Sequence, residues 1–298
     1  MKTDSKLLYV YPLMLVTTLF WALGHPLGRI ILRSMHPFQL GAINLVVGFL
    51  AVLAYLAIAG KAGMLFRLSL RDLLSSLALG VIGFSLYQIL TFSALSRIPA
   101  SVNAVLVATN AVLIVPLSAL ILRERIGWLR VVGILGAFAG VVVVTFNQGF
   151  SLDKTLDLTG CAFSLLAALS FALYTVLGKR LVERNDPLIV ATVALFSGAV
   201  VLTVLTAITP GLGGLLQTGA EPWALAVLLG VTMIGFAYPT WFTCLKRLPA
   251  SRVSVFIYLT PIFAVVLSFL ILREVFSWPF YLGGAMVLGG LIVASMAP

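Results

Sequence analysis

A few polar side chains set in long apolar segments are the residues of this sequence that could do chemistry. His25 is the one imidazole placed well inside such a segment, and Gln88 and Asn110 bring carboxamides into two others. Polar and ionisable groups in an apolar helix are functional candidates, because leaving them unpaired there costs free energy. Their chemistry is binding, since a carboxamide or a neutral imidazole both donates and accepts hydrogen bonds.

The same residue inventory argues against catalysis. Nucleophilic catalysis needs a nucleophile paired with a base, and a metal site needs clustered His, Cys or acidic ligands. The nine acidic residues lie near segment ends or in connections, and Cys161 and Cys244 fall separately inside apolar segments. We therefore predict no enzyme, no catalytic residue, no metal and no cofactor. The net charge of +10 is not arranged as a basic stripe with interleaved aromatics, so no nucleic-acid partner is predicted.

Aromatic side chains recur at helical spacing beside these polar groups. Trp21 and His25 are four residues apart, and Tyr87 and Thr91 repeat that spacing on another segment. Such faces suit a small zwitterionic or neutral ligand with an apolar body, held by amides and stacked on rings. Packing between helices is the alternative role for each residue. The predicted substrate-binding set is Trp21, His25, Phe84, Tyr87, Gln88, Asn110, Tyr174, Tyr238, Trp241 and Tyr258.

The elements that carry these residues are apolar segments long enough to cross a lipid bilayer. The chain is 61% hydrophobic and 9% charged, too few charges for a water-soluble surface. About 20 apolar residues span about 30 Å of hydrocarbon as a helix. The ten predicted spans are 8–32, 38–59, 73–95, 99–122, 127–147, 158–181, 188–209, 223–245, 250–272 and 278–297. The sequence predicts an all-α, multi-pass membrane protein whose surroundings are lipid.

Charge distribution predicts how these spans are oriented. With ten spans, 14 of the 19 lysines and arginines fall on the side that holds both termini. Short connections rich in Lys and Arg stay in the cytoplasm. We expect cytoplasmic N- and C-termini in a cell inner (plasma) membrane.

The sequence also contains a repeat at a fixed offset of 150 residues. The hexamer 96–101, SRIPAS, aligns with 246–251, KRLPAS, and the two apolar runs that follow both end in LILRE. Trp128 then aligns with Trp278 without a gap. Shared apolar bias does not match Pro, Trp, Arg and Glu, so we predict a duplicated five-helix unit within one domain, with repeats at 7–147 and 158–297.

Five is an odd number, which fixes how the two copies relate. The second copy begins on the opposite side of the membrane, and the halves are related by a pseudo-two-fold axis in the membrane plane. Such halves can rock around a site at the midplane. The predicted gate and hinge residues are Pro26, Gly28, Pro99, Gly178 and Pro249. The prolines also suit a simpler role at helix starts, and Pro26 a kink in the first span.

The inverted five-plus-five repeat and the paired R-[IL]-P-A-S and LILRE motifs resemble the EamA-type drug/metabolite transporter superfamily. The resemblance implies a transporter with a central cavity lined by spans 1, 3, 4, 6, 8 and 9. Relatives export amino acids and other small metabolites, and this chain looks closest to the aromatic amino acid exporters. Related branches carry sugar phosphates, which call for fixed cations in the cavity; here Lys and Arg lie at span ends.

These observations lead to one expected function and two alternatives. We expect an exporter of amino acids, aromatic or large neutral ones preferred, working by alternating access. The alternatives are an exporter of another small neutral metabolite or drug, and a channel or scaffold. No span has an acidic residue in its middle, which favours movement down the substrate's own gradient over proton coupling. The exact substrate and the oligomeric state stay open.

Overall fold

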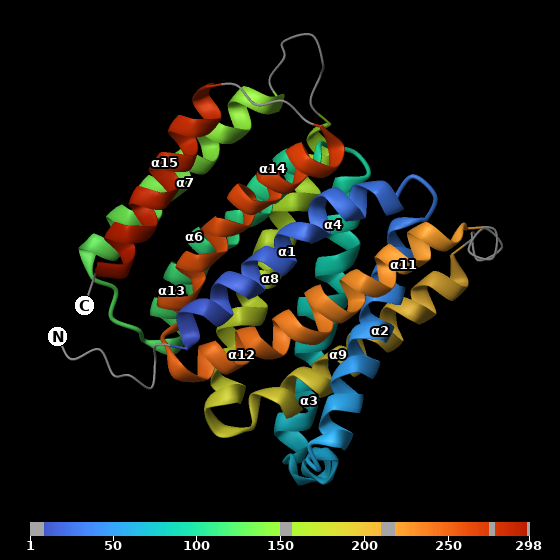
Figure 1. Cartoon of the computed structure of the whole chain (residues 1–298). Helices are drawn as coiled ribbons and strands as arrows, with labels where there is room; N and C mark the ends of the chain where they lie inside the picture. Colours follow the sequence, from blue (N-terminus) through green and yellow to red (C-terminus); the bar gives the residue numbers. More distant parts are fainter. Residues whose placement is uncertain (1–8, 150–156, 210–217, 274–277, 297–298) are drawn as a thin grey trace.

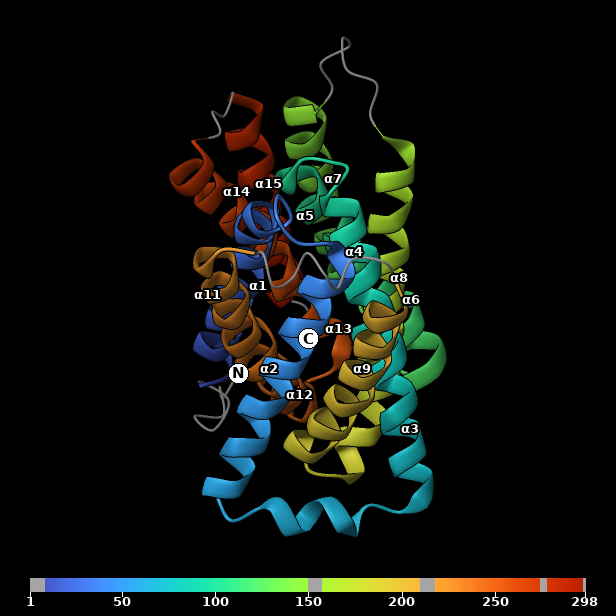
Figure 2. The same cartoon turned by 90° about the vertical axis from the view of Figure 1, so that its right-hand side faces the viewer.

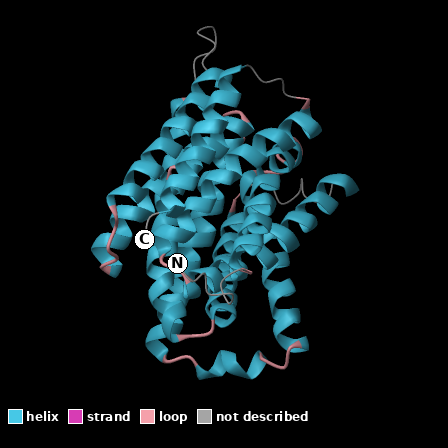
Figure 3. Ribbon diagram, turned by 60° about the vertical axis from the view of Figure 1, so that its left-hand side comes forward, coloured by secondary structure: helices cyan, strands magenta, loops and turns pink. Residues whose placement is uncertain are grey.

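The regular structure of the described chain is helical. The computed structural model describes residues 9–149, 157–209, 218–273 and 278–296, and in these ranges helices are joined by short connections (Figure 3). The helices are α1 (Val10–Ile31), α2 (Pro37–Ile58), η2 (Ala62–Arg67), α3 (Leu70–Gly80), η3 (Val81–Leu86), α4 (Tyr87–Leu95), α5 (Ala100–Ala108), α6 (Asn110–Leu117), η4 (Ser118–Leu122), α7 (Trp128–Gly149), α8 (Leu158–Arg184), α9 (Pro187–Ile208), α11 (Ala220–Leu229), η5 (Gly230–Phe236), α12 (Ala237–Arg247), α13 (Ala250–Val253), η6 (Ser254–Tyr258), α14 (Leu259–Leu272) and α15 (Trp278–Met296).

Eight helical stretches of the described chain are long and apolar enough to cross a membrane. They are Val10–Ile31, Pro37–Ile58, Leu70–Leu95, Val102–Leu122, Leu158–Arg184, Pro187–Ile208, Ala220–Arg247 and Ala250–Ile271. Each coincides with a span predicted from the sequence. The apolar stretches of α7 and α15, Trp128–Gly140 and Tyr281–Ala294, are shorter. A total of ten spans therefore stays a prediction.

Several helices begin at the residues that capping chemistry predicts. The Asp157 carboxylate accepts from the Gly160 backbone N–H at 3.0 Å, and Asp186 accepts from Leu188 at 2.9 Å. Pro187 then occupies the first turn of α9. Pro99 and Pro249 differ slightly from expectation: each is the residue before the first helical one, with extended ψ values of 149° and 144°.

Equivalent helices of the two copies pack against each other and run antiparallel. In α7 and α15, a Cβ built at Gly133 would lie 2.6 Å from the Gly290 carbonyl oxygen, and one at Gly140 would lie 2.5 Å from that of Gly283. The start of α7 thus contacts the end of α15, and the two helices run antiparallel. These two helices lie side by side at one edge of the molecule (Figure 1).

Helices α2 and α9 form a second such pair, seen beside each other in Figure 2. The Thr206 hydroxyl of α9 donates to the Phe38 carbonyl oxygen of α2 at 3.1 Å. One turn further along α2, a Cβ at Gly41 would meet the side chain of Leu202 at 2.6 Å. Antiparallel contact between equivalent helices is the arrangement that an inverted repeat requires.

Local irregularities recur at the same offset of 150 residues. Helix η3 and helix η5 are both π-helical turns at the middle of their spans, and both copies end their fourth helix with an arginine in the left-handed region, Arg123 and Arg273, each at φ 58°. Gly28 packs against the ring of Phe92, and Gly178 packs against the ring of Phe242 in the same way. The duplication thus extends from sequence to backbone detail.

The contact between α7 and α15 generates a testable prediction. At Gly290 a Cβ would overlap backbone atoms of Gly133 and Ala137, whereas at Gly284 it would meet nothing within 4 Å. Gly290→Ala should therefore lower the melting temperature and the folded yield, since overpacking costs about 1–3 kcal/mol. Gly284→Ala is the matched control and should melt like the wild type or slightly higher. Wild-type melting of Gly290→Ala would refute this account of the pair.

Candidate functional site

A cluster of aromatic rings lies at the centre of the molecule, between the two copies. Trp21 of α1 has ring centroids 5.1 Å from Trp241, 5.4 Å from Phe171 and 5.4 Å from Tyr238. These partners come from α8 and α12, so the cluster joins the first copy to the second. Tilted and edge-to-face rings at these separations attract each other beyond simple burial.

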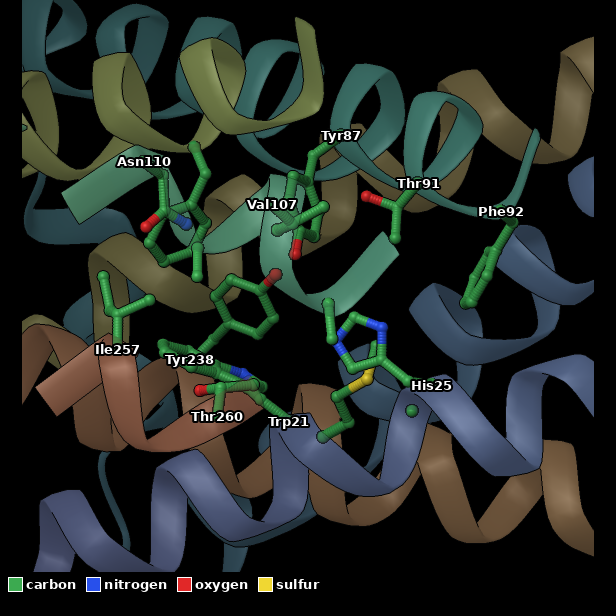
Figure 4. Close-up of a pocket in the computed structure, with 15 residues that line it drawn as sticks. Trp21, His25, Tyr87, Thr91, Phe92, Val107, Asn110, Tyr238, Ile257 and Thr260 are labelled. Atoms are coloured by element: carbon green, nitrogen blue, oxygen red, sulfur yellow. The ribbon is translucent and has the colours of Figure 1, made fainter. Parts of the chain in front are cut away.

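A small cavity adjoins this cluster (Figure 4). Its volume is about 40 Å³, which has room for a few water molecules and not for a metabolite. A substrate can therefore enter only when the surrounding helices separate. The lining residues are Trp21, Gly24, His25, Tyr87, Thr91, Phe92, Ala104, Val107, Ala108, Asn110, Phe171, Met233, Tyr238, Ile257 and Thr260.

The lining is polar without being charged. None of its residues is Asp, Glu, Lys or Arg. In the part of the chain that the structure describes, the Trp21 Nε1–H, the Asn110 Oδ1 and the Thr260 hydroxyl are buried without a hydrogen-bond partner. Residues around the cavity thus hold one unpaired donor, one unpaired acceptor and one unpaired group that does both, and a ligand could satisfy them when the space widens.

Five of the ten predicted binding residues line the cavity: Trp21, His25, Tyr87, Asn110 and Tyr238. Figure 4 shows them converging from α1, α4, α6 and α12. Their contact with a substrate stays a prediction. What the structure adds is that side chains far apart in the sequence meet around one space.

The other five predicted residues lie behind the lining. Phe84 and Tyr174 are fully buried, and the Tyr174 ring stacks on Phe242 at 4.9 Å. Trp241 is fully buried against Trp21. The Tyr258 hydroxyl points to α7, where it donates to the Ile134 carbonyl oxygen at 3.4 Å.

Gln88 is fully buried too, and it lies between the lining residues Tyr87 and Thr91 on α4.

Several lining residues are missing from the predicted set. Phe171, Thr91, Met233 and Thr260 are among them. The repeat holds a signal for two: Phe171 is the counterpart of Trp21, and Thr91 is the counterpart of Trp241. No sequence signal marks Met233, because its direction depends on the π-helical turn in η5.

His25 is held by a chain of hydrogen bonds that crosses three helices. The Ser164 hydroxyl of α8 donates to Asn103 Oδ1 of α5 at 2.8 Å, and Asn103 Nδ2 lies 3.5 Å from His25 Nδ1. This chain places the Asn103 amide beside Nδ1 of the His25 ring. At the repeat-equivalent positions, Thr175 stands for His25 and Val253 for Asn103. The hydrogen-bond chain therefore occurs in one half of the protein only.

Both ends of the central helices are tied together. At the end predicted to be cytoplasmic, the Glu124 carboxylate accepts from the backbone N–H groups of Ala250 at 2.8 Å and Ser251 at 3.2 Å. At the other end, Arg29 donates to the Ile98 carbonyl oxygen at 2.8 Å. Glu274, the counterpart of Glu124, lies outside the described residues.

An ion pair adds to the second end. Arg97 Nη1 lies 3.1 Å from the Asp157 carboxylate. The Gly160 backbone N–H and the Arg97 guanidinium together hold the pKa of that carboxyl below its ordinary value.

The predicted gate and hinge residues take up different positions. Pro26 and Gly28 are buried within α1, and Gly178 is buried within α8, where both glycines allow close approach of a phenylalanine ring. Pro99 and Pro249 lie at the starts of α5 and α13. Their part in any motion stays a prediction.

Apolar membrane-length helices around an uncharged, closed central cavity define the class of small-molecule membrane transporters. The profile of the EamA-like transporter family matches this chain twice, at residues 8–146 and 158–296. The chain belongs to that family, whose members are transporters and not enzymes. The resemblance inferred from the sequence motifs is confirmed.

Individual relatives agree with this assignment. An uncharacterized transporter of Archaeoglobus fulgidus is 28% identical over 93% of this chain and 95% of its own length. A probable terminal-alkyne amino-acid exporter of Streptantibioticus cattleyicolor is 28% identical over 94% of this chain and 91% of its own. One solved crystal structure matches 97% of this chain and 96% of that chain with a TM-score of 0.80 at 22% identity, which shows the fold.

The geometry of the two tryptophans predicts different outcomes on truncation. Trp21 lines the cavity, whereas Trp241 is fully buried behind it. Trp21→Ala should reduce flux about tenfold through loss of an aromatic contact, and should lower the melting temperature less than Trp241→Ala does, because Trp21 is only partly buried. Trp241→Ala should lower both the flux and the melting temperature, because the void it leaves costs about 3–5 kcal/mol of folding free energy. Trp128, at 72% exposure, is the control: Trp128→Ala should change neither. Wild-type flux in Trp21→Ala would remove Trp21 from the site.

Proposed function

We propose that this protein is an inner-membrane exporter of amino acids, with a preference for aromatic or large neutral ones. The observation that supports this is the central cavity, whose lining combines Trp21, Tyr87, Phe171 and Tyr238 with uncharged hydrogen-bonding groups. An apolar side chain stacks on the rings, and the unpaired groups of the lining satisfy a zwitterionic head. A phosphorylated substrate would instead need fixed cations.

The relatives add support for the cargo. One of them is named a probable amino-acid exporter, although its identity to this chain is 28%. We extend that name to a proposal for this chain because the lining chemistry agrees with it. The termini are proposed to be cytoplasmic, in keeping with the excess of basic residues on their side.

The proposed mechanism is alternating access between the two copies. The cavity lies where the copies meet, and each end is tied by contacts between segments of different spans, Glu124 to Ala250 at one end and Arg29 to Ile98 at the other. Releasing one end while keeping the other exposes the site to one side of the membrane at a time. The conformation described here, with both ends tied and about 40 Å³ of central space, corresponds to the closed intermediate of that cycle.

The proposed driving force is the substrate's own gradient. A proton-coupled carrier needs a group on the pathway that gains and loses a proton in each cycle. The lining has no acidic residue, and His25 is its one imidazole.

A transport assay in proteoliposomes tests both proposals. A panel of amino acids should give saturable, stereoselective flux with counterflow, strongest for aromatic and large neutral members. Non-saturating flux would indicate a channel, and no flux for any amino acid would contradict the proposed cargo. With substrate equal on both sides and a pH gradient imposed, we expect no net movement. Uphill accumulation that disappears in His25→Gln would overturn the uniport proposal and make His25 the coupling residue.

A further inference from the structure

Two buried carboxamides have no partner for any of their polar atoms. Asn44 of α2 and Gln88 of α4 are both fully buried, and within the described chain neither the oxygen nor the nitrogen of either amide makes a hydrogen bond. A buried amide without a partner costs about 1–3 kcal/mol on the evidence of mutational data. Such a destabilising amide can be explained if it forms its hydrogen bonds in another conformation of the protein.

The two amides lie on neighbouring helices. A Cβ built at Gly41 would touch the Cβ of Gln88 at 3.4 Å, and Asn44 follows Gly41 by three residues on the same face of α2. On its other side, the backbone of Asn44 approaches Gly230 of η5, where a Cβ would lie 3.2 Å from the Asn44 carbonyl oxygen. Asn44 is therefore placed among α2, α4 and η5.

Both neighbouring elements reach the cavity. Tyr87 and Thr91 of α4 flank Gln88 in the sequence and line the space, as does Met233 of η5. The repeat counterpart of Gln88 is Tyr238, which lines the cavity from the other half. Gln88 is not part of the lining in this conformation, so it would meet a substrate only if α4 turned or shifted as the space widened.

Buried hydroxyls around these amides are paired in some places and unpaired in others. Ser85 donates to the Gly198 carbonyl oxygen at 3.0 Å, and Thr206 donates to Phe38 and Leu202. The Thr91 hydroxyl of α4 and the Tyr174 hydroxyl of α8 have no partner within the described chain. Asn44 and Gln88 differ from these hydroxyls because each leaves both a donor and an acceptor unpaired.

We propose that Asn44 and Gln88 form the head-group end of the substrate site, exposed when the cavity widens. Amide oxygens accept from an ammonium or N–H group, and amide nitrogens donate to a carboxylate or carbonyl. The ligand class is a small zwitterionic or neutral head group, and this step rests on the proposed function. The counterpart of Asn44 is Ala194, so one half of the protein has the pair and the substrate binds in one orientation.

Replacing either amide by an apolar side chain should keep or raise the stability of the protein and weaken substrate binding. In Asn44→Leu and Gln88→Met, an apolar group of similar size replaces an unpaired amide, which relieves its desolvation cost. Both variants should melt at or above the wild-type temperature in detergent. Both should lose the melting-temperature shift that substrate gives the wild type, and the half-saturation concentration for flux should rise at least tenfold. Thr206→Val is the matched control: it should melt lower, because its hydroxyl is paired, and keep the substrate-induced shift.

Two results would overturn the inference. A lower melting temperature in Asn44→Leu and Gln88→Met would mean that the amides are hydrogen-bonded in the resting protein, as packing residues would be. Higher stability with unchanged flux and unchanged shift would mean that they do not meet substrate. The substrate used is whichever compound the wild type transports in proteoliposomes, from a panel of amino acids extended by other small neutral metabolites. A compound other than an amino acid would refute the proposed cargo, and the amide pair would still be tested on that compound.

Discussion

Close backbone contact between the two copies is the constraint on which the rest of the structure depends. Inside a bilayer, helices gain no hydrophobic attraction for each other, so they associate where small residues let their backbones meet. Glycines provide those meeting points here: Gly133 with Gly290 and Gly140 with Gly283 in the α7–α15 pair, and Gly80 against Ala194 between α3 and α9. Each of these contacts joins one copy to the other. The central cavity lies between the two copies that these contacts hold together.

Symmetry and asymmetry serve different purposes in this arrangement. The copies share backbone features such as the left-handed arginines and the π-helical turns η3 and η5, and in the proposed cycle the two halves exchange roles. The turns η4 and η6 are not repeated, since 268–272 and 104–108 are α-helical. The polar side chains are not symmetric either. His25 corresponds to Thr175, Gln88 to Tyr238 and Asn44 to Ala194. In the proposed mechanism, motion relies on what the copies share and recognition on what they do not.

The sequence predicted eight membrane-length helices that the structure shows, because hydrophobic length is a direct consequence of the chain itself. It also predicted a gapless repeat, with which the double match of the family profile agrees. It predicted the site less completely. A 3.6-residue period shows which side chains share a face but not which neighbour that face meets. Phe84 is in the predicted binding set, yet the π-helical turn of η3 changes the register before α4, and Phe84 is fully buried outside the cavity lining. Tyr258 likewise turns to α7 because Ile134 offers a carbonyl oxygen there.

The central claim is that the two ends of the helix bundle open alternately, and a pair of distances tests it most directly. Spin labels at positions 96 and 270 report on one end, and labels at the repeat counterparts 246 and 120 report on the other; all four side chains are exposed. The labelled chains would have Cys161 and Cys244 replaced by alanine and would first be shown to transport. During turnover, the account predicts that one distance lengthens as the other shortens. Active transport with both distances unchanged, or with both lengthening together, would contradict it.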